Sequence, residues 1–309
     1  MIQIEEAAIR KIILHRISEE HKSIISNSLL DYAEEDESVL NKIFLKPFTS
    51  QIQTFEFTNS VDMDYNVLFN VSKKIYEGKD FIKESKNIAK HLISCSTHAN
   101  INDGDLFIVK FDDIKLNDKH YEAVGIYKFE DKDSFLETSV LDKEISVSFR
   151  KGIGNKKPDK ACLILFTDEP YTLLIIDGNN NDTEYWQNDF INNKPKNDFI
   201  NNTTDFLTLT KDFITAQIPN EFDISRADQI DLLNRSVGYF KKNESFDKTE
   251  FENEVFQHQN VIKSFRDFDK SYRKENDIEL ADSFEISPLA VKKQARIFKS
   301  VLKLDKNFH

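Results

Sequence analysis

The chain has 309 residues, with 42 Lys or Arg against 54 Asp or Glu, so its formal net charge is −12. The apolar fraction of 39% is low, but 12% aromatic residues, 26 of them Phe, bury large areas and exclude general disorder. No apolar run is long enough to span a bilayer, and Glu5 and Glu6 stand where a secretory signal carries basic residues. We therefore expect a cytoplasmic protein that does not enter the membrane.

The first hundred residues carry one ambiguous segment and three helical patterns. The first of these patterns is the helical spacing of Ile25, Leu29, Tyr32 and Ala33. Loose alternation over residues 8–17 favours a strand, and a helix stays open as the alternative. Apolar residues then recur at four-residue steps over 67–75 and stop before Gly78, a natural helix end. Asp80 is placed to cap a helix over residues 81–94, whose apolar stripe predicts one face packed on a core.

From Asp105 the apolar period becomes strand-like. It predicts six strands, over residues 105–111, 121–129, 134–140, 144–149, 161–167 and 170–177. Their connections are too short for crossover helices, so we expect a largely antiparallel sheet. This pattern argues against a doubly wound nucleotide-binding fold.

The segment 179–202 holds nine Asn among 24 residues, interrupted by Trp186 and Phe190. Such a composition is typical of a long surface connection with some aromatic anchoring. We place a domain boundary near its end. The sequence thus predicts an α+β fold, with helices packed on the sheet in residues 1–200 and a mainly helical C-terminal domain in residues 201–309.

The C-terminal part shows several helix signals. Helical spacing begins at residue 205, and two cap pairs follow, Ser225 with Asp228 and Asp247 with Glu250. The final segment opens with Ser287-Pro288, a cap and a residue suited to the first turn. Two readings of it remain: one helix to residue 306 with a basic stripe, or a helix over 288–295 followed by a strand over 296–304. We prefer the second, because residues 296–304 are rich in β-branched and aromatic side chains.

The acidic total hides two basic segments. Residues 286–309 carry a local charge of +5 and residues 150–160 carry +4; without them, the remaining 274 residues carry −21. Lys and Arg near phosphates dominate DNA affinity, although most charge runs only solvate a surface. The candidate DNA-contacting residues of these segments are Arg150, Lys151, Lys156, Lys157, Lys160, Lys292, Lys293, Arg296, Lys299 and Lys303.

Two further segments give only weak signals, one for a bound nucleotide at residues 150–160 and one for a metal ion at His91, Cys95 and His98. The first segment lacks the spacing of a Walker loop and the third glycine of a dinucleotide fingerprint. His91, Cys95 and His98 have no second ligand pair at metal-binding spacing, so packed side chains are the better interpretation. We predict neither a cofactor nor a metal.

A metal-dependent nuclease would need clustered carboxylates and a lysine. Two sets fit: Asp105 with Asp113 and Lys115, and Asp113 with Glu130 and Lys132. A chain this rich in acids and lysines gives about six such sets by chance, so neither carries weight. No catalytic residue is assigned, and we expect a protein that is not an enzyme.

Three longer runs are more specific: NIAKHLISCSTHANINDGDLFIVKF (87–111), SRADQIDLLNRSVGYFKKNESFD (225–247) and ISPLAVKKQARIFKSVLKLDKNFH (286–309). Together they closely resemble the NdpA-like group of bacterial nucleoid-associated proteins, over essentially the whole chain. The resemblance implies a protein of the cytoplasm and nucleoid that binds double-stranded DNA without an established catalytic activity. Its motif positions transfer as contributors to DNA binding: Arg226, Arg235, Lys292, Lys293 and Arg296.

The sequence therefore predicts a nucleoid-associated protein that binds double-stranded DNA, mostly without sequence preference, through local basic patches on an acidic body. The two basic segments would share one surface. A homodimer is left open, and the sequence identifies no protein partner. The competing functions are a metal-dependent nuclease or nucleic-acid defence component, and a protein-interaction scaffold.

Overall fold

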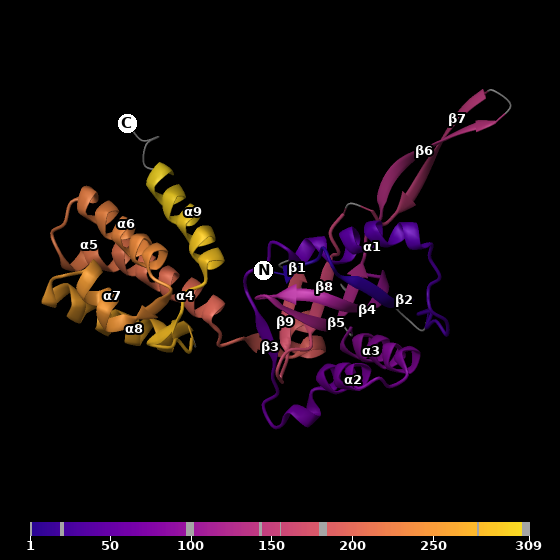
Figure 1. Cartoon of the computed structure of the whole chain (residues 1–309), viewed down its shortest axis with the longest axis horizontal. Helices are drawn as coiled ribbons and strands as arrows, with labels where there is room; N and C mark the ends of the chain where they lie inside the picture. The colour runs from indigo at the N-terminus through magenta and orange to yellow at the C-terminus, as the bar shows by residue number, and fades with distance from the viewer. Residues whose placement is uncertain are drawn as a thin grey trace. The chain divides into compact units, whose positions relative to one another are not determined.

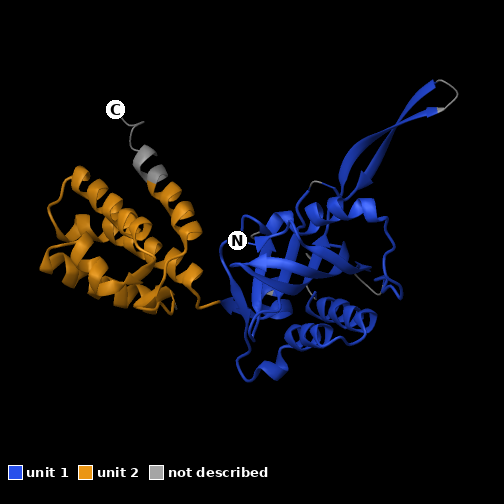
Figure 2. Ribbon diagram, in the orientation of Figure 1, with its two compact units in different colours: residues 1–195 blue, residues 196–309 orange. Residues whose placement is uncertain are grey.

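The computed structural model describes residues 2–18, 22–96, 102–141, 144–154, 156–178, 184–276 and 278–304, and the side chains of 299–304 lie outside this description. The chain divides into two compact units, Met1–Pro195 and Lys196–His309, shown in separate colours in Figure 2. Along both, no helix of the described residues is long and apolar enough to cross a membrane.

Unit 1 is built on an antiparallel sheet in the order β1-β4-β5-β8-β9-β3-β10, with β2 also paired to β4 (Figure 1). Its strands are β1 (Ile2–Gln3), β2 (Ala8–Ile17), β3 (Phe55–Phe57), β4 (Gly104–Leu116), β5 (Lys119–Phe129), β8 (Lys160–Leu165), β9 (Thr172–Asp177) and β10 (Asn193–Pro195). Side chains alternate between the two faces of a strand. Along β8, Cys162 and Ile164 join one buried cluster while Leu163 and Leu165 join another. The sheet is therefore covered on both faces.

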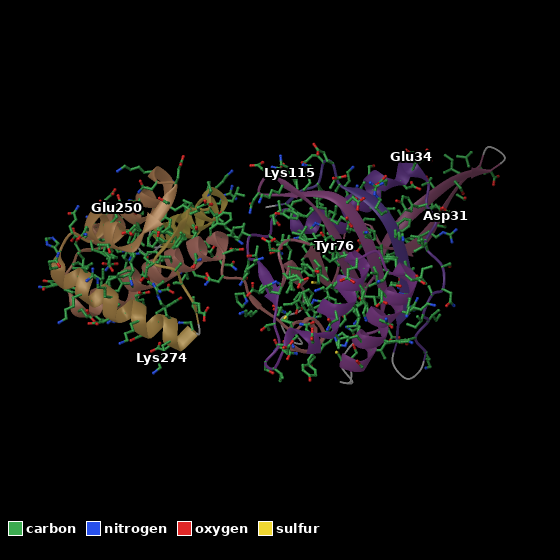
Figure 3. The ribbon with its side chains drawn as sticks, turned by 60° about the horizontal axis from the view of Figure 1, so that its bottom comes forward. Asp31, Glu34, Tyr76, Lys115, Glu250 and Lys274 are labelled. Atoms are coloured by element: carbon green, nitrogen blue, oxygen red, sulfur yellow. The ribbon has the colours of Figure 1, made fainter. Side chains whose placement is uncertain are left out.

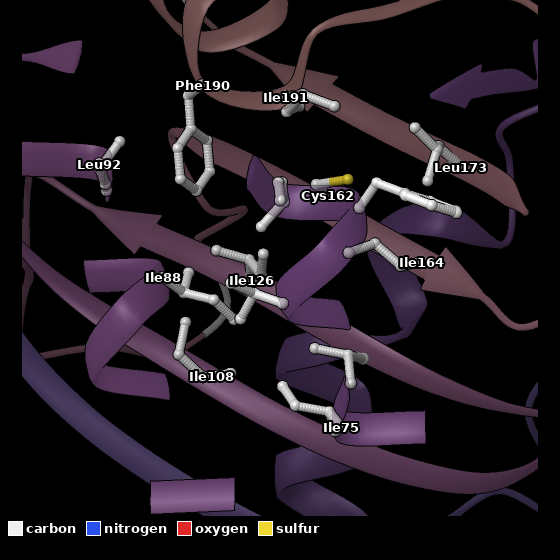
Figure 4. Close-up of a cluster of buried hydrophobic side chains, with 14 of the residues drawn as sticks. Ile75, Ile88, Leu92, Ile108, Ile126, Cys162, Ile164, Leu173, Phe190 and Ile191 are labelled. Atoms are coloured by element: carbon white, nitrogen blue, oxygen red, sulfur yellow. The ribbon is translucent and has the colours of Figure 1, made fainter. Parts of the chain in front are cut away.

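Helices α2 (Val67–Tyr76) and α3 (Phe81–Cys95) cover the first face. Figure 4 shows this cluster, in which Ile88 and Leu92 of α3 meet Ile108 and Ile126 of the sheet. Helix α1 (Glu37–Phe44) and the short turn Lys46–Phe48 cover the opposite face. Asp80 caps α3 by accepting from the backbone amides of Ile82 and Lys83, as its position predicts.

Strands β6 (Asp133–Leu141) and β7 (Glu144–Gly152) do not join this sheet. They pair only with each other among the described strands and form a hairpin arm that projects from unit 1 (Figure 1). All six predicted strands are present, and the preferred strand over residues 8–17 is confirmed as β2. The helix predicted from the spacing of Ile25, Leu29, Tyr32 and Ala33 is wrong, because residues 25–33 form no regular element. The sequence did not indicate that the two middle strands leave the sheet.

The structure corrects the prediction for the Asn-rich segment 179–202. Its residues 179–183 lie outside the description, but the rest is not a surface connection, because a π-helical turn (Glu184–Ile191) and β10 fill most of it. Trp186 and Phe190 are almost completely buried. The aromatic anchors therefore decide the structure of this segment more than its Asn content does.

Unit 2 is mainly helical. Its elements are α4 (Phe199–Asp212), a π-helical turn (Phe213–Gln217), α5 (Ile218–Glu221), α6 (Arg226–Lys242), β11 (Ser245–Asp247), α7 (Lys248–Val255), α8 (Gln259–Asn276), β12 (Ser283–Glu285) and α9 (Pro288–Leu304). Both predicted caps are present: Ser225 and Asp228 form a full capping box on α6, and Asp247 caps α7. Phenylalanines supply much of the core, with Phe206 in ring contact with Phe246 and Phe251. The predicted α+β class is confirmed.

The preferred reading of the last segment is wrong. Residues 288–304 form one helix, α9, and not a short helix followed by a strand. Val291, Ala295 and Phe298, at steps of four and three, are buried in the unit 2 core. Packing of this stripe outweighs the weak strand preference of the β-branched residues.

Candidate nucleic-acid interface

Helix α9 presents its cations to solvent because its apolar side is fixed to the core. The helix packs on α4 and α6, and the Gln294 side-chain amide donates to Thr208 Oγ1 at 3.2 Å. Lys292 and Arg296, four residues apart, lie on one exposed face, and Lys293 is exposed beside them. Lys299 and Lys303 continue the same spacing, but their side chains lie outside the description.

A hollow of about 330 Å³ lies on the surface between the start of α9 and the end of α6. It is lined by Lys241, Pro288, Val291, Lys292, Ala295 and Arg296. Lys241 is exposed, and no ion pair among the described residues involves it, Lys292 or Arg296, whereas its neighbour Lys242 lies 3.6 Å from Glu254. Three cations thus surround a concave apolar floor. We call Lys241, Lys292, Lys293 and Arg296 the α6–α9 patch.

The structure does not bring Arg226 into this patch. Arg226 lies in the first turn of α6, 15 residues before Lys241, which corresponds to about 22 Å along a helix. Its guanidinium donates to Gln229 at 2.7 Å. Arg235 is half-buried and its Nε lies 2.9 Å from Asp231 one turn earlier. Both arginines therefore have local partners on their own helix.

The basic segment of unit 1 is largely neutralised by carboxylates from outside it. Arg150, on β7, pairs with Glu137 of β6 at 2.8 Å. Lys156 lies 3.2 Å from Asp131 and 3.5 Å from Asp159. Lys151 and Lys157 are exposed, and neither has an ion pair within the described ranges. Once Glu137, Asp131 and Asp177, the partner of Lys160, are counted, the +4 of residues 150–160 falls to +1.

Lys160 differs from its neighbours because it is buried. Its side chain is 2% exposed and forms an ion pair with Asp177, which is 7% exposed. Its ammonium also lies 5.3 Å from the ring centre of Tyr185. On the adjacent strand, Lys128 Nζ donates to Glu130 at 2.8 Å, and burial lowers the pKa of this lysine. A buried ammonium held this way does not reach a phosphate, so Lys160 belongs to the core of unit 1.

The carboxylates considered for a nuclease do not gather. Asp105 is held by Lys132 at 2.7 Å and Arg16 at 3.6 Å. Asp113 lies eight residues further along β4, about 26 Å for an extended strand, at 3.9 Å from His120. Within the described residues no three His, Cys, Asp or Glu side chains are placed to hold a metal ion.

His91 and Cys95 are packed side chains. The ring nitrogen Nε2 of His91 lies 3.0 Å from the Phe190 carbonyl oxygen, and Cys95 Sγ lies 3.7 Å from Nδ1. Burial lowers the pKa of His91 and raises that of Cys95. His98 lies outside the described residues.

Sequence reasoning missed Lys241. It lies within the run 225–247, but no local charge excess marks it, because Asp228, Asp231 and Glu244 offset its neighbours. Only the packing of α6 against α9 places it beside Lys292 and Arg296.

A comparison with known proteins identifies the family of the chain. The family model described as nucleoid-associated protein YejK matches residues 13–309, that is, most of unit 1 and all of unit 2. A comparison with curated proteins finds no match. A nucleoid-associated family places its members at the bacterial nucleoid in the cytoplasm, as the sequence runs predicted. The chain belongs to the nucleoid-associated protein YejK family.

Proposed function

We propose that the protein binds double-stranded DNA through the phosphate backbone, mostly without sequence preference, and that the α6–α9 patch is its main contact. The observation that supports this proposal most strongly is the hollow at the α6–α9 patch. It is lined by Lys241, Lys292 and Arg296, which have no ion-pair partners in the described part of unit 2. Unpaired lysines and arginines are ready to replace counterions on phosphates. Acidic residues elsewhere on the chain would repel DNA and favour one orientation.

Unit 1 plays the smaller part in this proposal. Lys151 and Lys157 remain as contacts, while Arg150 and Lys156 would first have to leave Glu137 and Asp131. Within unit 2, Lys299 and Lys303 extend the patch by their spacing, and Arg226 and Arg235 contribute only by exchanging their present partners. We further propose that the contacts of both units act on the same duplex and that the protein has a binding role, not a catalytic one.

The test is duplex affinity by fluorescence anisotropy at fixed salt. Replacing Lys241, Lys292 and Arg296 together by Ala is expected to weaken binding by roughly 100-fold or more near 0.1 M salt, since each phosphate contact contributes about 5- to 10-fold there. The loss should be equal for two duplexes of unrelated sequence, and Mg²⁺ should leave both uncut. The matched control is Lys274→Ala on α8, an exposed lysine of the same unit that Figure 3 labels. Unchanged affinity of the triple variant would exclude the α6–α9 patch as the contact.

A further inference from the structure

The hairpin arm of unit 1 has two chemically different faces. The register pairs Leu136 with Phe149, Thr138 with Val147, and Val140 with Ile145, and side chains of such directly opposed residues lie on the same face. Five large apolar side chains therefore share one face. Their exposed fractions are 59% for Leu136, 72% for Val140, 77% for Ile145, 57% for Val147 and 82% for Phe149. We call these five residues the apolar arm face.

The opposite face already has its partners within the arm. Ser139 and Ser146 hydroxyls lie 2.7 Å apart, and Glu137 accepts from Arg150 at 2.8 Å. Phe135, the one large apolar residue described there, is 51% exposed and lies partly against Gly152, where a Cβ would approach its ring to 2.9 Å. This face is suited to water, and the apolar arm face is not.

A two-stranded ribbon with one uncovered apolar face is marginally stable in water by itself. The area involved is substantial: at about 150 to 200 Å² for each large apolar residue, the exposed fractions give roughly 600 Å² on each copy. Monomeric proteins rarely expose an apolar patch of that size without using it. We therefore expect the apolar arm face to be buried in an interface.

We propose that a second copy of the chain covers it, with the two apolar arm faces packed against each other across a two-fold axis. Two such faces would bury roughly 1,200 Å² in total, the lower end of specific protein interfaces. The bulky pair Leu136 and Phe149 lies toward the base of the arm, and the smaller pair Val140 and Ile145 toward its tip. Antiparallel arms oppose large to small side chains, and Val147 then lies close to the axis.

DNA fits the arm less well than a second copy does. Residues 133–152 contain Asp133, Glu137, Asp142 and Glu144 against Lys143, Arg150 and Lys151, a net charge of −1. Of the basic residues described there, Arg150 is paired with Glu137 on the opposite face, whereas Lys151, at the base of the arm, is exposed and on the same side as Phe149. Beyond the contact that Lys151 offers at the base, a polyanion would gain little from this surface. The inference goes beyond DNA binding, although a dimer would double the α6–α9 patches and strengthen binding by avidity.

The sequence Ile145-Ser146-Val147 supplies a matched pair of variants, because neighbouring residues of a strand face opposite sides. Val147→Asp places a charge on the apolar arm face, and Ser146→Asp places the same charge on the polar face. A central interface substitution costs roughly 30-fold or more. Since a two-fold interface carries each residue twice, the dimer dissociation constant should rise by about 1,000-fold in Val147→Asp.

Oligomeric state is measured by light scattering on the full chain from about 1 to 100 μM, with circular dichroism to verify folding. The proposal expects a dimer for the wild type and Ser146→Asp, and a monomer for Val147→Asp. Loss of the dimer in both variants, retention in both, or a monomeric wild type overturns it.

A second measurement does not depend on a disruptive charge. Val147→Cys should be linked to its copy by a short bis-maleimide, and Ser146→Cys should not; the wild type, which contains Cys95 and Cys162, gives the background. Equal linking of both variants, or of neither, contradicts the two-fold arrangement. DNA affinity is measured separately, so failure of the arm dimer and failure of the α6–α9 patch are distinguishable.

Discussion

The buried pair of Lys160 and Asp177 separates a structural lysine from a DNA-binding one. The sequence placed Lys160 among the phosphate contacts, but its side chain is 2% exposed and ion-paired. The test is Lys160→Met, which keeps an apolar stem but leaves Asp177 buried without its cation. Asp177 Oδ2 already has no hydrogen-bond partner among the described residues, so the carboxylate would be left almost unsatisfied.

Removing one partner of a buried ion pair costs about 3 to 5 kcal/mol. For unit 1, with its 195 residues, this corresponds to a fall of roughly 10 °C in Tm. The double variant Lys160→Met/Asp177→Leu should recover most of the loss, because an apolar pair of similar volume replaces the ions. Lys157→Ala, exposed on the same segment, should stay within about 0.5 kcal/mol of the wild type.

Urea unfolding gives the free energies, and salt titration of duplex binding gives the second readout. The structural role predicts lower stability for Lys160→Met with an unchanged salt dependence of binding. Wild-type stability together with a log-log slope reduced by about one would refute it and return Lys160 to the DNA-contacting set.

Two pH predictions follow from buried ionisable groups. Burial, with the charge of Lys86, lowers the pKa of His15 to about 4, and Ser26 N donates to its Nδ1 at 3.1 Å. The stability that neutral His15 contributes is thus complete above pH 6.5 and declines toward pH 4. The free energy of unfolding should be about 2 kcal/mol lower at pH 4.5 than at pH 7.5 in the wild type, and His15→Gln should not show this difference. An equal difference in that variant would contradict the assignment. Burial, with the charge of Asp198, raises the pKa of Asp205 to about 6. The stability that its protonated carboxyl group contributes is therefore fully present below pH 3.8 and is lost as the pH rises through 6. Asp205→Asn should stabilise unit 2 by about 1 to 2 kcal/mol at pH 7 and by less than half as much at pH 4.5. No gain at pH 7 would show that the carboxylate is solvated.

Local patterns could predict much of the fold. Alternation is preserved in β8 because Cys162 and Leu163 belong to cores on opposite faces of the sheet. The helix caps could be predicted equally well, because the capping box of Ser225 and Asp228 depends only on two residues three positions apart. Both signals are set by neighbours in sequence, and tertiary packing reinforces them.

The partners of charges could not be predicted. Arg150 pairs across the arm with Glu137, 13 residues away, and Lys160 pairs with Asp177 across two strands. A local charge count registers the cations but not the carboxylates that the sheet register brings to them. The same limit hid Lys241, whose relation to Lys292 depends on helix packing.

The last segment shows how propensity and packing compete. Its β-branched residues favoured a strand, yet the steps of four and three from Val291 to Phe298 were also present and fit one docked helical face. Burial of that face contributes several kcal/mol, more than the few tenths per residue that separate strand and helix preferences.

The slope of log affinity against log salt concentration for duplex DNA tests the central claim most directly. Each phosphate contact contributes about 0.9 to that slope. Replacement of Lys241, Lys292 and Arg296 by Ala is therefore predicted to flatten it by about 2.7 relative to the wild type, with Lys274→Ala unchanged. A wild-type slope near zero, or one that the triple variant leaves as it was, would contradict DNA binding through the α6–α9 patch.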